Sequence, residues 1–218
     1  MDAPPLPDGT DRAYSLLKAA ISAVPVVGGP AAELLSLVLQ PPLEQRRAQW
    51  LDDLAHRLSD LQTEGISLDR LKSDERFITA VLRATQAALR THQTAKLEAL
   101  RNAVVNIGRL ARPDDVLQEL FLQYIDELSA AHLQLLKAAD IFPYAEDRHT
   151  SIDSIARSQM PEIVDDWRLL RVLWNDLQAR GLVDEHLHPV KGGRDQRRPG
   201  VTVMGKAMLA LVSSSSEA

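Results

Sequence analysis

Apolar residues recur at steps of three and four along most of the chain, which is the spacing of amphipathic helices. Pro25, Gly28-Gly29-Pro30 and Pro41-Pro42 interrupt this pattern near the N-terminus and are expected to end helices there. A serine followed by two acids at 73–75 opens the longest apolar pattern, as expected of a capped helix start. The helices predicted on this basis cover residues 10–24, 31–40, 43–63, 73–110 and 113–139.

The last third of the chain has a different pattern. It predicts helices at 152–160, 161–181 and 205–212, strands at 182–187 and 201–203, and a Gly-, Arg- and Pro-rich loop at 190–200. The order helix, turn, helix, strand, loop, strand is typical of a winged helix. The predicted fold class is therefore mainly α, a multi-helix bundle with a C-terminal winged-helix-like α+β module. We expect a helical domain at 10–113, the winged-helix-like domain at 114–212, and disordered tails at 1–9 and 213–218.

The composition excludes some kinds of site and indicates the kind of core. The 218 residues include no cysteine, which excludes disulfides, thiolate catalysis and Cys-ligated zinc. Aromatic residues make up 4%, so the core must consist mostly of aliphatic side chains, which favours packed helices. The N-terminus is acidic and Pro-rich without a basic region, so we do not expect a secretory signal there. We expect a cytoplasmic protein with a net charge of −5.

The layout of the whole chain resembles bacterial Abi-alpha-like proteins, which are associated with abortive phage infection. The residues that carry the resemblance are the apolar segment 31–39 after a Gly-Gly-Pro break, the Leu97-Glu98-Ala99-Leu100-Arg101-Asn102 stretch, and the Gly181-Leu182-Val183…Gly205 ending. The resemblance implies a helical region before a winged-helix-like C-terminus, and a role in phage defence without known catalytic residues.

The predicted long helix carries many basic residues. Seven lie between positions 76 and 112, with Glu98 as the one acid among them. At about 100° per residue, five of them share one narrow sector; these are Arg76, Arg83, Arg90, Arg101 and Arg112. Such a face could bind phosphate in nucleic acid or in anionic lipid headgroups. The alternative is a solvated face, or pairing with acids on a neighbouring helix.

The predicted wing supplies four more basic residues that could contact phosphates, Lys191, Arg194, Arg197 and Arg198. Residues 114–218, however, contain 11 basic and 17 acidic groups, a net charge of −6. Phosphate contacts dominate DNA affinity. The charge therefore favours use of the module for protein–protein contacts over DNA binding.

Residues 19–39 contain Glu33 as their one charge and would be long enough to span a bilayer as a single helix. The proline and glycine breaks divide the segment, and a buried helical hairpin is the expected structure. The alternative is a hairpin that inserts into membrane when an effector is triggered. Its apolar residues would be Val24, Val26, Val27, Leu34, Leu35, Leu37 and Val38.

Two further patterns indicate chemistry only weakly. The segment 200–207 nearly matches a phosphate-binding loop, but Ala207 stands where Ser or Thr should hold magnesium. Asp184, His186 and His188 would share one face of a strand and could hold zinc or nickel, although a polar strand face is the commoner case. We therefore expect no catalytic residues, no metal and no cofactor.

These patterns lead to an order of functional hypotheses. The first is a non-enzymatic bacterial interaction or regulatory protein, with a protein partner or self-association. The second is a winged-helix nucleic-acid binder that uses the wing and the arginine face. The third is an effector that acts on anionic membranes through the 19–39 hairpin.

Overall fold

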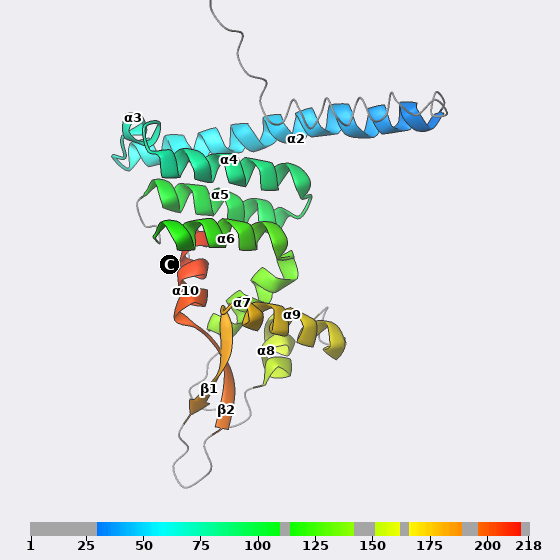
Figure 1. Ribbon diagram of the computed structural model, residues 1–218, viewed down its shortest axis with the longest axis vertical. Coiled ribbons are helices and arrows are strands. Elements are labelled where there is room, and N and C mark those ends of the chain that lie inside the picture. Colours follow the sequence, from blue (N-terminus) through cyan, green and yellow to red (C-terminus); the bar gives the residue numbers. More distant parts are fainter. Residues whose placement is uncertain (1–29, 110–113, 142–150, 162–165, 189–195, 215–218) are drawn as a thin grey trace, which may run out of the picture. The chain divides into compact units, whose positions relative to one another are not determined.

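The computed structural model describes residues 30–109, 114–141, 151–161, 166–188 and 196–214, with the backbone alone for 30–42, Ser158, 186–188 and 196–198. These residues are mostly helical and include one small antiparallel sheet, which confirms the mainly α fold class (Figure 1). The chain divides into two compact units, Met1–Gln49 and Trp50–Ala218. Among the described residues, no helix combines the length and the apolar character needed to cross a bilayer.

In the second unit, helices stack in chain order. The end of α2 (Pro30–Thr63) is followed by the short α3 (Leu68–Leu71), then by α4 (Glu75–Arg90), α5 (Thr94–Gly108) and α6 (Asp115–Glu127). Helix α5 lies between α4 and α6 in Figure 1, and it is buried along most of its length. A second group contains α7 (Ala130–Ile141), α8 (Ile152–Gln159) and α9 (Trp167–Ala179).

A two-stranded hairpin and a last helix complete the unit. Strands β1 (Val183–His188) and β2 (Gln196–Val201) pair antiparallel, with Val183 opposite Val201 and His188 opposite Gln196. Helix α10 (Val203–Val212) returns to pack against α5 and α7. The predicted order of elements in this part is confirmed, although β2 begins earlier than expected. The winged-helix assignment, which rests on this order, stays a prediction.

Four predicted helix boundaries were wrong. The helix predicted for 161–181 begins at Trp167, after the Asp166 cap. Residues 30–63 form one helix through Pro41 and Pro42, because a proline removes one hydrogen bond and crowds one carbonyl without excluding helical backbone. The predicted helix 73–110 is two helices, and Thr91 leaves the helical conformation with ψ 148°. The predicted helix 113–139 also breaks, at Leu128, whose ψ is 146°.

The apolar core crosses the expected domain boundary at residue 113. Helix α5 packs against α6 and α10, so residues on both sides of that position share one core. The core is aliphatic, as composition indicated, and its largest side chains include Trp174, Phe121, Leu100 and Leu135. Ser213 was expected in a tail, but it caps α10 with an N–H bond to Leu209.

Candidate functional site

The solvent-facing side of α9 combines exposed apolar and basic residues. Trp167 is 56% exposed and Val172 is 55% exposed, both far above the values usual for such large apolar side chains in a core. Arg168 and Arg171 are exposed on the same helix, and the Arg168 guanidinium lies over the Trp167 ring at 5.7 Å. Neither arginine has a carboxylate partner within the described part of the chain. Leu169 on the same helix is 42% exposed. We name this surface, formed by Trp167, Arg168, Leu169, Arg171 and Val172, the α9 face.

The opposite side of α9 holds the helix in place. Leu170, Leu173, Trp174 and Leu177 are buried at helical spacing and form one stripe. The Asp166 carboxylate caps the helix by accepting the Leu169 N–H at 3.1 Å. These contacts hold one side of α9 against the core and leave the α9 face toward solvent.

Two charged residues near the end of α9 contact neighbouring helices. The Asp176 carboxylate lies 3.4 Å from Nε2 of the buried His132 on α7, and burial lowers the pKa of that imidazole. Arg180 pairs with Glu127 on α6 at 3.0 Å and lies over the Tyr124 ring. Asp176 thus contacts α7, and it forms no ion pair with Arg168 or Arg171 among the described residues.

A tight corner attaches the hairpin to α9. Gly181 has a φ of +70°, a conformation that glycine adopts without strain, and the Leu182 N–H donates to the Leu177 carbonyl at 3.0 Å. The Thr202 hydroxyl then donates to the Gly181 carbonyl at 2.6 Å and accepts the Gly205 N–H at 3.0 Å. The base of the hairpin is thus tied directly to the C-terminal end of α9.

The expected basic wing is described only in part. Arg197 and Arg198 lie on β2 opposite Leu187 and His186, and their backbone alone is described. Lys191 and Arg194 lie outside the described residues. The prediction that these four residues contact phosphate stays untested.

The arginines of α4 are paired with acids on α6. Arg76 lies 2.6 Å from Asp115, Arg83 lies 3.6 Å from Glu119, and Arg90 lies 2.5 Å from Asp126. Both helices run in the same direction, so the three pairs form a ladder between them (Figure 1). This is the neighbouring-helix pairing left open by the sequence, and it compensates the charge of the α4 face.

The other two arginines of the expected stripe are not part of that face. Because the chain turns back at Thr91, Arg101 lies on α5, where it pairs with Asp53 on α2 at 2.5 Å and lies over the Trp50 ring. Its side chain is only 14% exposed. Arg112 lies outside the described residues. The prediction of five arginines on one helix face was therefore wrong in its geometry.

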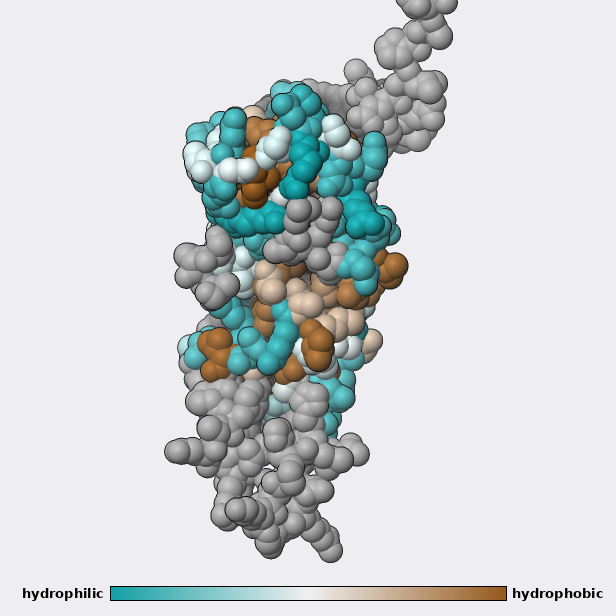
Figure 2. All heavy atoms as spheres, turned by 90° about the vertical axis from the view of Figure 1, so that its left-hand side faces the viewer, coloured by the Kyte–Doolittle hydropathy of each residue, from teal (hydrophilic) through white to brown (hydrophobic). Residues whose placement is uncertain are grey.

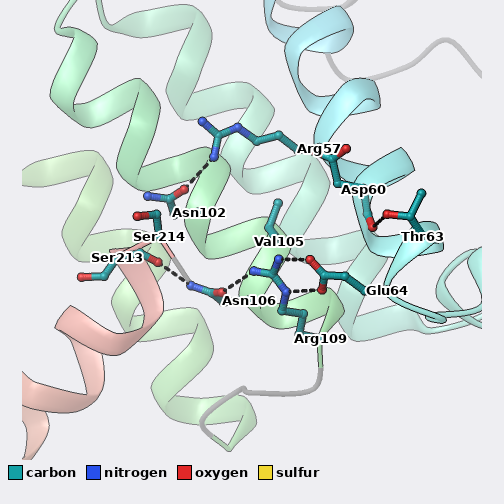
Figure 3. Close-up of a pocket in the computed structure, with 10 residues that line it drawn as sticks. All are labelled: Arg57, Asp60, Thr63, Glu64, Asn102, Val105, Asn106, Arg109, Ser213 and Ser214. Carbon is teal, nitrogen blue, oxygen red and sulfur yellow. Dashed lines mark hydrogen bonds and ion pairs between the residues drawn. The ribbon is translucent and has the colours of Figure 1, made fainter. Parts of the chain in front are cut away.

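A polar pocket of about 400 Å³ lies between the C-terminal parts of α2, α5 and α10 (Figure 3). Two buried asparagines one helical turn apart on α5 form its floor. The Asn102 side-chain N–H donates to the Val212 carbonyl at 2.8 Å, and the Asn106 side chain donates to the carbonyls of Leu211 at 2.8 Å and Ser213 at 3.0 Å. These bonds satisfy the carbonyls that end α10.

Ion pairs close the other side of this pocket. Arg109 binds both carboxylate oxygens of Glu64 at 2.7 and 2.5 Å, and this bond raises the pKa of Arg109 and lowers that of Glu64. Arg57 donates to Asn102 at 2.9 Å and to Glu98 at 2.6 Å. In Figure 2, hydrophilic side chains cover the end where α2 and α3 meet, and more apolar ones follow over α10. The pocket's polar groups mostly satisfy one another, which is the pattern of a structural seam.

The weaker sequence patterns do not form sites in the described residues. In the loop-like segment 200–207, residues from Val203 onward belong to α10, and Gly205 packs against the Leu182 backbone. Asp184 accepts the Glu185 N–H, whereas the His186 and His188 side chains are not described. The described residues contain no group of three or more metal-ligating side chains.

The apolar hairpin predicted for membranes is described only in part. Val24, Val26 and Val27 lie outside the described residues. The other four, Leu34, Leu35, Leu37 and Val38, are on α2, where the backbone alone is described.

Sequence reasoning missed the two asparagines and His132. A signal existed for the asparagines, because Asn102 and Asn106 stand four residues apart in the stretch 102–107, whose other residues are apolar, and asparagine is unfavourable inside a helix. His132 gave no such signal, since its partners Ser129 and Asp176 are set by the tertiary structure. Comparisons of this chain with protein-family models, curated proteins and solved structures gave no match.

Proposed function

We propose that this chain is a non-enzymatic interaction module that binds a protein partner through the α9 face. The observation that carries the proposal is the exposure of Trp167 and Val172 beside Arg168 and Arg171 on one helix whose other side is buried. Tryptophan and arginine are the residue types most enriched among the side chains that dominate binding energy at protein interfaces. The partner surface that fits is an apolar one flanked by carboxylates, which would complement the two arginines.

Charge argues against self-association through the same surface. A symmetric dimer would place Arg168 and Arg171 of one copy against the same residues of the other. Like charges in such an interface oppose binding. We therefore propose a different protein as the partner.

Selection from a library of displayed random peptides, with the whole chain as bait, tests the proposal. Enriched peptides should combine Leu, Ile or Phe with Asp or Glu. Their affinity should fall about tenfold or more in Trp167→Ala, as expected for a central aromatic anchor, and also in Arg171→Glu. Arg83→Glu is the matched control, because it reverses an exposed arginine on α4. Peptides that bind both α9 variants as well as the native chain would contradict the proposal.

Duplex nucleic acid is the second candidate, and the same helix favours it. Arg171 and Asn175 are exposed one turn apart on α9, and arginine and asparagine are side chains that read base edges in the major groove. Asp176, an acid on the same helix, lies 3.4 Å from His132 on α7 and is half exposed, so its charge opposes this second candidate.

Fluorescence anisotropy with a random-sequence duplex at two salt concentrations decides this candidate. If the duplex is the ligand, binding should weaken steeply with salt. It should also be lost in Arg171→Glu and in a triple charge reversal of Arg194, Arg197 and Arg198. Binding absent at low salt would eliminate nucleic acid.

Phage defence is the biological setting that we propose, on the resemblance of residues 31–39, 97–102 and 181–205 to Abi-alpha-like proteins. Plaque counts on a bacterial host that expresses the chain test this setting. Protection should be present with the native chain and reduced by Trp167→Ala. Equal plaque counts with and without the native chain would contradict the setting, whereas the peptide selection tests the α9 face independently.

A further inference from the structure

The turn between α4 and α5 meets the turn between α6 and α7 around a second cavity, of about 340 Å³. Its lining includes two cationic side chains, Arg90 and Lys96, together with Thr91, Gln93 and Ser129. Lys96 is nine-tenths buried, which is rare for a lysine without a carboxylate bonded to its ammonium group. The cavity is distinct from the α9 face and is not used by the proposed protein contact.

The Lys96 ammonium group is only partly satisfied by the described residues. It donates one hydrogen bond, of 2.8 Å, to the backbone carbonyl of Asp126. An ammonium group has three N–H donors. Burial lowers the pKa of Lys96, and this effect outweighs the opposing one of the Asp126 carboxylate; the neighbouring Arg90 also lowers the pKa.

The N-terminus of α5 adds positive potential at the same place. Helix α5 has 15 residues, and Lys96 lies in its first turn, where a cation is unfavourable. That turn contains no acidic residue, and Gln93 does not cap it, because the Gln93 side-chain oxygen accepts the Ala130 N–H of α7 instead. The start of α5 therefore faces the cavity without an anionic or side-chain cap.

Carboxylates near the cavity are already engaged. Asp126 binds Arg90 at 2.5 Å through its carboxylate. Glu127 binds Arg180 at 3.0 Å and accepts a hydrogen bond from Gln123. One carboxylate, that of Asp126, thus faces two cations and an uncapped helix start, which leaves a local excess of positive charge.

We infer that this cavity, named the Lys96 cavity, binds a phosphate group held by the Lys96 ammonium, the Arg90 guanidinium and the first N–H groups of α5. Backbone N–H groups at a helix start and arginine or lysine side chains are the donors that proteins use for phosphate. A bound anion would offset the excess positive charge and accept hydrogen bonds from the remaining N–H groups of the Lys96 ammonium. The group could be free phosphate or part of a phosphomonoester, since both present the same three oxygens.

Titration of the whole chain with inorganic phosphate, followed by amide NMR shifts at constant ionic strength against chloride, tests this inference. Shifts should concentrate at Thr94, Ala95 and Lys96, up to about 20 mM phosphate, a range that covers millimolar dissociation constants. A parallel titration with phenyl phosphate distinguishes the two sources. Tighter binding of phenyl phosphate assigns the site to a phosphomonoester, and equal or weaker binding assigns it to the free ion.

Variants separate a bound phosphate from a general salt effect. Lys96→Met and Arg90→Gln should each lower the affinity for phosphate at least tenfold, whereas Lys72→Met should leave this affinity unchanged. Lys72 is an exposed lysine paired with Asp69, and it controls for the loss of one charge. Because Arg90 is exposed, Arg90→Gln remains informative if Lys96→Met fails to fold. Shifts equal to those with chloride, or unchanged affinity in Arg90→Gln, would overturn the inference.

Discussion

At the scale of single residues, buried polar side chains decide contacts that the apolar pattern leaves open. Asn106 on α5 holds the carbonyls that end α10. His132 accepts the Ser129 N–H at the start of α7 and faces Asp176 on α9. Each of these side chains joins elements that are far apart in the sequence. The apolar periodicity predicts the helices but not these contacts, because only the fold brings the partner residues together.

Replacement of Asn106 by alanine should destabilise the protein. The change leaves buried carbonyls of α10 without donors, which costs about 1–3 kcal/mol. Urea unfolding measures the loss as a lower midpoint. Gln62→Ala is the matched control, since it removes an exposed side-chain amide from α2 and should stay within about 0.5 kcal/mol of the native chain. Equal losses in the two variants would contradict the role of Asn106.

The buried His132 predicts a pH dependence of stability. Burial lowers its pKa in the folded protein below the ordinary value of 6.5. The unfolded chain therefore binds a proton at His132 first as the pH falls, and stability should decrease below about pH 6.5. Unfolding free energies between pH 7.5 and 5.5 should fall less steeply in His132→Gln than in the native chain. His92→Gln, at an exposed histidine, should keep the native slope, and an unchanged slope in His132→Gln would refute the account.

At the scale of elements, the sequence predicted helices well where proline, glycine or capping residues mark their ends, and less well elsewhere. The helix from Ile152 and the strand from Val183 follow clear turn signals and were predicted within one or two residues. The break at Thr91-His92-Gln93 contains neither proline nor glycine, and it is stabilised by the Thr91 hydroxyl accepting the Gln93 N–H. That break moved Arg101 away from the arginines of α4, which is why the candidate anion face was mispredicted.

The corner between α9, β1 and α10 depends on a close approach that only glycine permits. A Cβ at position 205 would overlap the Leu182 carbonyl oxygen and crowd Val201. Gly205→Ala should therefore lower the free energy of unfolding by about 3 kcal/mol, the upper end of the usual cost of overpacking. Thermal unfolding measures the effect. Lys206→Ala, the next position on α10, is exposed and should change the midpoint by no more than a few degrees.

At the scale of the second unit, charge and exposure separate two kinds of surface. The arginines of α4 meet acids of α6 and are compensated. The α9 face keeps both its apolar residues and its arginines exposed on a helix whose other side is fixed in the core. The helical spacing of the arginines pointed to the first surface, because the sequence does not show which acids on a neighbouring helix pair with them. The structure therefore shifts the candidate contact from α4 to α9.

The most direct test of this account is a map of the contact on the protein itself. Amide NMR shifts recorded while a selected acidic and apolar peptide is added report which residues it touches. The account predicts that the shifts concentrate on Trp167 to Asn175 of α9, with α4 unaffected. Shifts concentrated on Arg76 to Arg90 of α4, with α9 unchanged, would contradict it.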